Sequence, residues 1–301
     1  MSRPAIDALT TDILILGSGG AGLLAALHAF DADPTLDITI VVKGLFGKSG
    51  CTRLVQGGYN VVLSADDSLD RHFLDTIKAG QYLNDQELAW ALVNNAPRCV
   101  HELEHKYGCF FDRNPDNTIH QKAFAGQSFD RTVHKGDLTG IEIVNRLSEH
   151  VRQRRIRVVE EHRALDLLRD PGHTRIAGAL VHDIRRGGYL AVTAKAVLLA
   201  TGGGPTMYAM TAASADKSLD GLAMAFRAGA ELCDMEMVQF HPTGLLVADS
   251  LMTGTVLEEG LRGAGGHLYN GARERFMARY DPDRMERSTR DVVARSSYLE
   301  I

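Results

Sequence analysis

Three glycines near the start of the chain have the spacing of a phosphate-binding turn. Gly17, Gly19 and Gly22 form the pattern G-x-G-x-x-G. The first glycine permits a tight turn, the second lets the backbone approach a pyrophosphate, and the third lets a helix pack closely on a strand. The helix that follows offers unpaired N–H groups and the positive end of its dipole. We therefore predict that a dinucleotide phosphate binds at Gly17, Ser18, Gly19, Gly20, Ala21 and Gly22.

The residue that follows the second expected strand is basic rather than acidic. NAD-binding proteins of this type carry an Asp or Glu there, which binds a ribose hydroxyl. This chain has Lys43 after Val41 and Val42, which disfavours NAD. Lys43 either contacts the adenosine end of a dinucleotide or is a solvated strand end, and both interpretations stay open.

Three further segments supply small and hydroxyl residues where a backbone could approach a flat ring system. They read GKSGCT at 47–52, QGG at 56–58 and ATGG at 200–203. Glycine permits such a close approach, and successive N–H groups in such turns can bind anions. The candidate cofactor contacts in them are Ser49, Gly50, Cys51, Thr52, Gln56, Gly57, Gly58, Thr201, Gly202 and Gly203.

Taken in order, these segments and several later motifs resemble the flavoprotein family of succinate dehydrogenase, fumarate reductase and L-aspartate oxidase. The resemblance covers nearly the whole chain and implies FAD as the cofactor, held also by Asp220 and the turn 201–203. The later motifs lie at 131–140, 220–221, 227–230, 234–236, 239–244 (QFHPTG), 259–263 (EGLRG) and 290–293 (RDVV).

The resemblance also implies which residues carry the chemistry. In this family a hydride passes between a dicarboxylate carbon and the flavin, while an arginine moves a proton at the adjacent carbon. The matching residue is Arg290, and Glu259 with Arg262 resembles the relay that reloads it, since an arginine gives up a proton only if neighbours restore it. The alternative is that Arg290 forms only a local ion pair with Asp291. His241 resembles the residue that binds a substrate carboxylate.

This chain departs from the family pattern at three positions. Cys51 stands where covalent members carry the histidine that bonds the flavin, so we expect non-covalent FAD, with a cysteinyl thioether at Cys51 as the alternative. Glu258 stands where a threonine usually binds substrate, and its charge would repel a carboxylate. Thr253 or Thr255 could supply the hydroxyl instead. Ala264 stands where a glutamate is common. Reaction type is therefore better determined than substrate.

Bulk composition excludes several classes of protein. The formal net charge is −5, from 33 basic and 38 acidic residues, which disfavours nucleic acid as a partner. The 4 cysteines lack C-x-x-C spacing, which argues against structural zinc. His101, Glu102 and His105 are interpreted as a solvated helix face, so we expect no metal site. The apolar runs are too short to span a bilayer, which indicates a cytoplasmic chain, or one at the inner face of a membrane through a partner.

The pattern of apolar residues predicts the elements that position these groups. Strands are expected at 12–16, 38–42 and 196–200, with β-rich runs within 155–192. Helices are expected at 23–30, 217–232 and 287–301, and across 66–106 with an interruption at Pro97. The predicted class is α/β: a Rossmann-like FAD-binding domain over 1–237, then the start of an α+β capping domain over 238–301. Because the chain stops within an expected helix, we expect a truncated, inactive fragment.

The combined prediction is an FAD-dependent oxidoreductase that transfers a hydride between flavin and a dicarboxylate such as succinate, fumarate or aspartate. An iron–sulfur subunit is a candidate partner that nothing in the chain decides. One alternative is a catalytically silent flavin-binding module in assembly or sensing. A plain NAD-binding Rossmann protein is a weaker alternative, because of Lys43 and the flavin-type segments.

Overall fold

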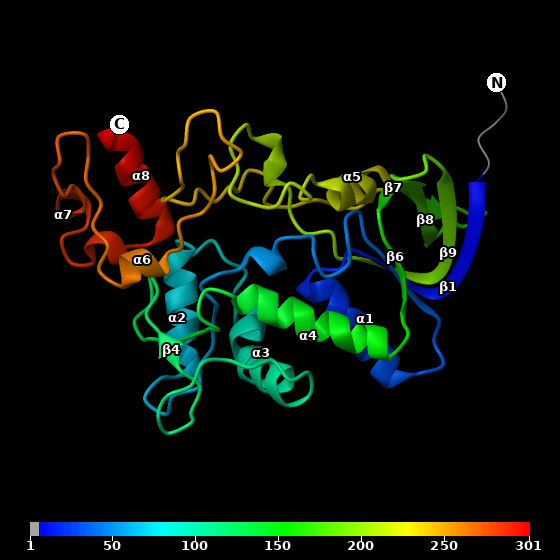
Figure 1. Ribbon diagram of the computed structural model, residues 1–301, viewed down its shortest axis with the longest axis horizontal. Helices are drawn as coiled ribbons and strands as arrows, with labels where there is room; N and C mark the ends of the chain where they lie inside the picture. The colour runs from blue at the N-terminus through cyan, green and yellow to red at the C-terminus, as the bar shows by residue number, and fades with distance from the viewer. Residues whose placement is uncertain (1–5) are drawn as a thin grey trace. The chain divides into compact units, whose positions relative to one another are not determined.

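A computed structural model describes residues 6–301, which form two compact units (Figure 1). Unit 1 contains residues 6–54 and 140–235, and unit 2 contains residues 55–139 and 236–301. The sequence analysis divided the chain once, at residue 237, whereas the segment 55–139 groups with the C-terminal part. The domain division of the whole protein stays a prediction.

Unit 1 is built on a six-stranded mixed sheet with the order β6-β2-β1-β9-β8-β7. β1 pairs in parallel with β2 and β9, and β2 pairs in parallel with β6. β7, β8 and β9 are joined antiparallel. The predicted α/β class is confirmed, with a sheet that is parallel from β6 to β9 and antiparallel from β9 to β7. The strands are β1 (Ile6–Leu16), β2 (Ile38–Val41), β6 (Arg157–Val159), β7 (His162–Arg169), β8 (Ile176–Asp183) and β9 (Tyr189–Leu199).

The core of this sheet explains why β1 ends where the glycine turn begins. Leu14 and Leu16 are buried together with Val41 and Val192, and each such side chain contributes about 1.5–3 kcal/mol when fully buried. Because β1 and β2 are parallel neighbours, both end at the same edge of the sheet. That edge carries the glycine turn and the segment after Val41, as expected for a dinucleotide site in a doubly wound sheet.

The helices of unit 1 differ in length from the expected ones. The helix predicted over 217–232 spans only Asp220–Arg227, because Leu219 adopts a left-handed φ of 59° before it and Gly229 one of +87° after it. Neither conformation continues a right-handed helix. The unit 1 elements are α1 (Gly20–Ala32), α4 (Thr139–Gln153), α5 (Asp220–Arg227) and the 3₁₀ turns η1 (Thr52–Leu54) and η2 (Pro205–Met207).

The two long helices of unit 2 correct one prediction. α2 (Leu69–Ala79) and α3 (Gln86–His105) are separated at 80–85, whereas Pro97 lies inside α3. The expected interruption at Pro97 is therefore wrong. Asp85 begins α3 by accepting a hydrogen bond from Leu88 N at 3.0 Å, a strong N-cap. Proline costs the helix one hydrogen bond, but the buried apolar face of this 20-residue helix continues on both sides of it.

The rest of unit 2 consists of short elements. A small sheet has the order β3-β5-β4, and Phe276, Met277 and Val293 form a separate apolar core. The helix predicted over 287–301 is present as α8. The elements are β3 (Tyr59–Asn60), β4 (Gln121–Lys122), β5 (Thr132–Val133), α6 (Gly260–Gly263), α7 (Met277–Tyr280), η3 (Met285–Arg287) and α8 (Arg290–Glu300). Among the described helices, none combines the length and apolarity needed to cross a membrane.

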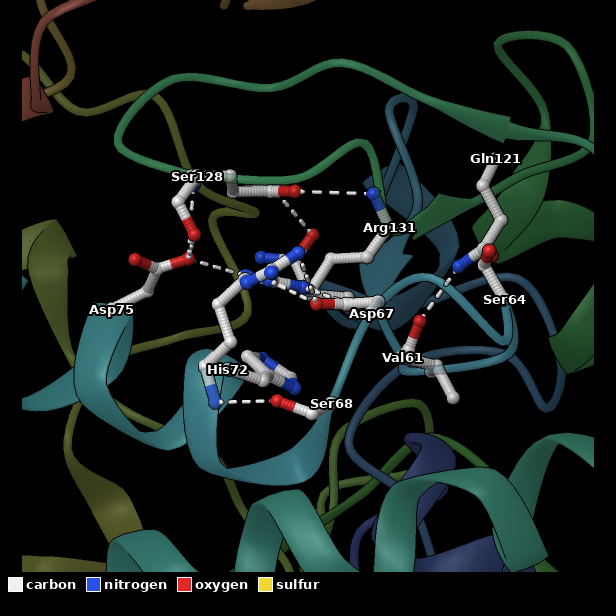
Figure 2. A network of polar contacts seen from close by, with 12 residues as sticks. Val61, Ser64, Asp67, Ser68, His72, Asp75, Gln121, Ser128 and Arg131 are labelled. Atoms are coloured by element: carbon white, nitrogen blue, oxygen red, sulfur yellow. Dashed lines mark hydrogen bonds and ion pairs between the residues drawn. The ribbon is translucent and has the colours of Figure 1, made fainter.

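A buried ion-pair network fixes the segment before β5 (Figure 2). The Arg131 side chain has no exposed surface, and its Nε and Nη2 bind the two carboxylate oxygens of Asp67 at 2.8 Å each. Its Nη1 binds Asp75 at 2.5 Å, and Asp75 also accepts a hydrogen bond from Ser128 N at 2.9 Å. Removing one partner of such a buried pair costs about 3–5 kcal/mol. Arg131 therefore ties α2 to the 128–133 segment.

Candidate functional site

Unit 1 contains a cavity of about 400 Å³ at the edge where β1, β2 and β9 end. Most of the cofactor contacts predicted for this unit line it, although they come from five separate stretches of sequence. The predicted residues that line the cavity are Gly17, Ser18, Gly19, Gly20, Ala21, Lys43, Ser49, Gly50, Cys51, Thr52, Thr201, Gly202 and Asp220.

The glycine turn has the geometry of a diphosphate cradle. Gly17 has φ +114°, and a Cβ there would lie 2.3 Å from Ala200 O. A Cβ on Gly22 would lie 2.0 Å from Gly17 O, so Gly22 serves close packing rather than lining the cavity. The N–H of Gly20 donates to Thr52 Oγ1 at 3.0 Å. The turn thus fits the anionic group that the N-terminus of a helix attracts.

Lys43 and Asp220 form an ion pair at the cavity wall. Lys43 Nζ lies 2.8 Å from Asp220 Oδ2 and also donates to Asp216 O at 2.6 Å. Arg163 binds the other oxygen of Asp220 at 2.6 Å. Burial alone would raise the pKa of Asp220, but the hydrogen bonds from Lys43 and Arg163 outweigh it and hold the pKa below its ordinary value. Lys43 is therefore a fixed part of the wall, not a solvated strand end.

Sequence reasoning missed Asp216, a second carboxylate in the same wall. Its Oδ2 accepts hydrogen bonds from Gly50 N at 3.1 Å and from Ser214 Oγ at 2.9 Å. Ser214 N in turn donates to Cys51 Sγ at 3.3 Å. These contacts join the 49–52 loop to the 214–218 loop. The one signal for Asp216 in the sequence is a polar loop directly before Asp220.

The remaining predicted cofactor residues lie outside this cavity lining. Among the described residues, none apart from its two chain neighbours comes within 4 Å of where a Cβ on Gly203 would sit. Gln56, Gly57 and Gly58 belong to unit 2, where Gln56 O accepts a hydrogen bond from Thr139 Oγ1 at 3.1 Å.

Sterics require glycine at 58, whereas a side chain at 57 would meet the ends of two neighbouring side chains. A Cβ on Gly57 would lie 2.3 Å from Phe124 Cζ and 2.7 Å from Glu258 Oε1. Gly58 has φ +117°, and a Cβ there would lie 2.0 Å from Val133 O. A side chain at either position would displace its neighbours.

Unit 2 brings the three predicted catalytic residues together. Arg290 Nε lies 2.5 Å from Glu259 Oε2, and Arg262 Nη2 lies 3.7 Å from the same oxygen. The other oxygen of Glu259 accepts a hydrogen bond from Ala125 N at 3.0 Å. Glu259 and Arg262 are buried, whereas the Arg290 side chain is 37% exposed. Within residues 6–301 the ion-pair partner of Arg290 is thus Glu259 rather than Asp291.

The environment of Arg262 disfavours the positive charge of its guanidinium group. Burial lowers the pKa of Arg262, and the charge of Arg290 lowers it further, while Glu259 and Glu286 act in the opposite direction. Arg262 Nη1 donates to Glu286 O at 2.8 Å. Arg262 Nε and Nη2 are buried without a hydrogen-bond partner among the described residues. The cluster is therefore two guanidinium groups that share one carboxylate.

The predicted substrate contacts take different positions around this cluster. His241 Nε2 donates to Leu257 O at 3.1 Å, and burial together with Arg290 and Arg262 lowers the pKa of His241. His241 is therefore neutral near pH 7. Thr253 Oγ1 donates to Val247 O, so its hydroxyl holds its own loop together.

Glu258 has a basic neighbour that the sequence analysis did not identify. Glu258 Oε1 lies 3.6 Å from Lys122 Nζ, and the two side chains are 20% and 25% exposed. The same oxygen is buried and accepts no hydrogen bond from the described residues. A Cβ on Gly260 would lie 2.2 Å from Glu258 Oε2, so the carboxylate folds back over the start of α6. The charge that was expected to repel a substrate is partly balanced by Lys122.

Comparison with known proteins identifies the cofactor. The sequence profile of the family described as "FAD binding domain" matches residues 12–301. The chain belongs to this FAD-binding family. FAD is therefore its cofactor, and the glycine turn, Lys43 and Asp220 stay the predicted contacts for it. Whether Cys51 is bonded to the flavin stays open.

Three individual proteins indicate which kind of flavoprotein this chain is similar to. An uncharacterized FAD-dependent oxidoreductase of Methanocaldococcus jannaschii is 48% identical over 294 residues, 97% of this chain and 52% of that protein. One subunit of the fumarate reductase (CoM/CoB) of Methanothermobacter marburgensis is 43% identical over 293 residues, 96% of this chain and 52% of that protein. A structure of E. coli quinol fumarate reductase is 32% identical with a TM-score of 0.91, covering 98% of this chain and 51% of that one.

Two of these relatives are fumarate reductases, and a succinate dehydrogenase flavoprotein subunit of Rickettsia felis is 36% identical over 300 residues, so the chain is similar to flavoproteins of this type. The chain spans about half the length of the curated relatives that it matches.

Proposed function

We propose that the whole protein transfers a hydride between its FAD and a dicarboxylate of the succinate or fumarate type. The observation that carries the proposal is the carboxylate of Glu259, buried and bound to Arg290 at 2.5 Å, with Arg262 3.7 Å away. A merely structural surface pair would not need a second, buried guanidinium. Similarity to fumarate reductase subunits supports the same chemistry.

Arg290 is the proposed proton donor or acceptor. When bound, FAD supplies or accepts the hydride at one substrate carbon, so a proton must move at the adjacent carbon. Because Arg290 uses Nε to bind Glu259, its two terminal nitrogens remain for a substrate. The bond to Glu259 fixes the plane of the guanidinium, which orients the proton-bearing nitrogens before reaction.

Glu259 and Arg262 are proposed to restore the proton on Arg290. A guanidinium is a weak acid, so a neutral Arg290 must be reprotonated promptly. Glu259 binds Arg290 directly, and burial and the nearby charge of Arg290 lower the pKa of Arg262. Burial alone still makes Arg262 a stronger acid than an exposed arginine once Arg290 has lost its charge. A proton can then pass toward Arg290 through the shared carboxylate.

Substrate binding is proposed to involve neutral His241 and the Glu258–Lys122 pair. Lys122 favours a carboxylate, whereas Glu258 favours a hydrogen-bond donor such as an amino group. The presence of Glu258 supports an aspartate-like substrate as a second candidate, with oxidation of a carbon–nitrogen bond instead of a carbon–carbon bond. An iron–sulfur subunit is the proposed electron partner, since several relatives are named as subunits.

Single-turnover reduction of the flavin tests this proposal. The full-length protein is mixed anaerobically with succinate or aspartate, and flavin bleaching is followed by absorbance. In the reverse direction, chemically reduced protein is mixed with fumarate. We expect flavin reduction or reoxidation with at least one acid and none in an Arg290→Gln control. A flavin inert toward all three acids would instead support a catalytically silent module.

A further inference from the structure

Two histidines and a glutamate lie together at the C-terminal end of α3, in unit 2 and apart from the Glu259 cluster in sequence. His101, Glu104 and His105 occupy positions i, i+3 and i+4, which share one face of a helix. One potential ligand atom from each lies within 4.8 Å of the others. The two imidazole rings are nearly parallel, at 3°, with centroids 5.7 Å apart. Glu104, not Glu102, is therefore the acidic neighbour of the histidine pair.

The carboxylate of Glu104 is held in place for this arrangement. One oxygen is bound by Arg113, while the other lies 3.8 Å from His105 Nε2. The Glu104 side chain is 12% exposed, against 71% for His105. A ligand that is already oriented by a neighbour loses little freedom when it binds an ion. The exposed imidazoles can rotate toward it without disturbing the core.

We propose that His101, Glu104 and His105 form a binding site for a divalent transition-metal ion. Two imidazoles and one carboxylate suit Zn²⁺, Cu²⁺ or Ni²⁺, whereas Mg²⁺ and Ca²⁺ prefer oxygen ligands alone. Metal–nitrogen bonds of about 2.0 Å in tetrahedral geometry place ligand atoms about 3.3 Å apart. Small side-chain rotations reach that spacing from the present arrangement. Water would complete the coordination.

The helix dipole and the charged side chains around the site affect how tightly it binds a metal ion. The negative end of the α3 dipole lies beside it and favours a cation. Lys106 Nζ lies 3.1 Å from Glu102 Oε1, and Arg113 binds Glu104, so the four nearby charged side chains sum to zero. Affinity therefore comes from the imidazoles rather than from net charge.

Isothermal titration with Ni²⁺, Cu²⁺, Zn²⁺ and Mg²⁺ tests the site in the full-length protein. His101→Ala and His105→Ala should each weaken transition-metal binding by at least about tenfold, and Glu104→Gln by about tenfold. His173→Ala, which removes an exposed loop histidine, is the matched control and should change nothing. Among the three transition metals Cu²⁺ should bind most tightly, and Mg²⁺ should give no α3-dependent heat.

The outcome is decided by the difference between the parent and each variant, so metal sites elsewhere in the full-length protein do not interfere. Loss of one equivalent of bound metal in both histidine variants, with circular dichroism unchanged, supports the site. Equal stoichiometry and affinity in the parent and both histidine variants would overturn it. An equal loss in His173→Ala would overturn it too, because it would indicate non-specific binding to surface histidines.

Discussion

Lys43 and Asp220 lie 177 positions apart in the sequence, yet their side chains form a 2.8 Å ion pair at the wall of the cavity in unit 1. Lys43 follows β2, and Asp220 begins α5. The pair joins two elements that meet at the same edge of the sheet in unit 1. The basic residue that disfavours NAD thus anchors the acidic residue predicted to hold FAD.

Asp220→Asn should lower the affinity for FAD by about tenfold. The change keeps the size of the side chain but removes the charge that holds Lys43 and Arg163 in the wall, which leaves two cations to reposition. Flavin reconstitution of the full-length apoprotein measures the dissociation constant. Arg163→Gln is the control, because its side chain is 49% exposed, and it should change affinity less than about threefold. Unchanged or tighter FAD binding by Asp220→Asn would refute the proposal that Asp220 holds Lys43 and Arg163 in place for the cofactor.

The sequence predicted the backbone around this cavity well where local geometry decides. The spacing of Gly17, Gly19 and Gly22 specifies a strand, a turn and a helix, and these are present, with close approaches at Gly17 and Gly22 that only glycine allows. By contrast, Asp216 contacts Gly50 across 166 positions. No local pattern contains such a contact, because it depends on how two loops fold over one sheet edge.

The same reasoning explains the errors in unit 2. The local chemistry of proline predicts a helix break at Pro97, but the buried face of α3 extends past it. Packing therefore outweighs the one lost hydrogen bond. Lys122 lies on β4, far in sequence from Glu258. Its effect on that carboxylate could not be predicted from the motif around Glu258.

Acid precipitation should release the flavin into solution, because we expect no covalent bond between the flavin and Cys51. The Cys51 thiol lines the cavity and accepts a hydrogen bond from Ser214 N. A covalent link to the flavin would convert this thiol into a thioether. We expect yellow supernatant and a colourless pellet after treatment with trichloroacetic acid. Colour that stays with the pellet in the parent but not in Cys51→Ala would establish a cysteinyl link instead.

Glu286 should make unit 2 sensitive to acid. Burial would raise the pKa of Glu286, but two hydrogen bonds from Arg275 and one from Leu268 N lower it from 4.5 to about 2. Because the folded pKa is lowered, the stabilisation is complete above pH 4.5 and is lost as the pH falls toward 2. The shift corresponds to about 3 kcal/mol.

Urea unfolding at several pH values measures this contribution. Glu286→Gln should reduce the free energy of unfolding by about 3 kcal/mol at pH 7, and the difference from the parent should shrink between pH 4.5 and pH 2. Glu149→Gln serves as the control, because it removes an exposed carboxylate paired with Arg146 and should cost under about 0.5 kcal/mol. A difference that does not depend on pH would contradict the assignment.

Lys122→Met should weaken dianion binding more than Glu258→Thr strengthens it. Lys122 already balances part of the Glu258 charge at 3.6 Å, so removing Glu258 relieves only the remaining repulsion. We expect KM for succinate or fumarate to rise about tenfold in Lys122→Met, for about 1.4 kcal/mol, and to fall only a few-fold in Glu258→Thr. The double variant should return near the parent. Additive effects would instead leave KM about threefold above the parent, which would mean that the two charges do not act on the same substrate group.

Arg290→Lys should abolish turnover while retaining the flavin. Lysine keeps the positive charge but loses the planar fork that lets Nε bind Glu259 while the terminal nitrogens face a substrate. FAD content should stay near that of the parent, because Arg290 is not among the residues that line the cavity in unit 1. Substrate affinity should also stay near that of the parent, because lysine keeps the positive charge. The rate of flavin reduction in single-turnover mode should fall by at least about two orders of magnitude, the usual share of general acid–base catalysis.

Glu259→Gln should slow reduction as well, because it keeps the shape of the cluster but cannot accept the proton that Arg262 must return. If Arg290 served only to stabilise the start of α8, its replacement would cost under about 1 kcal/mol of unfolding free energy and leave the rate unchanged. Flavin reduction at the parent rate in Arg290→Lys would therefore exclude Arg290 as the proton donor, whatever its effect on stability.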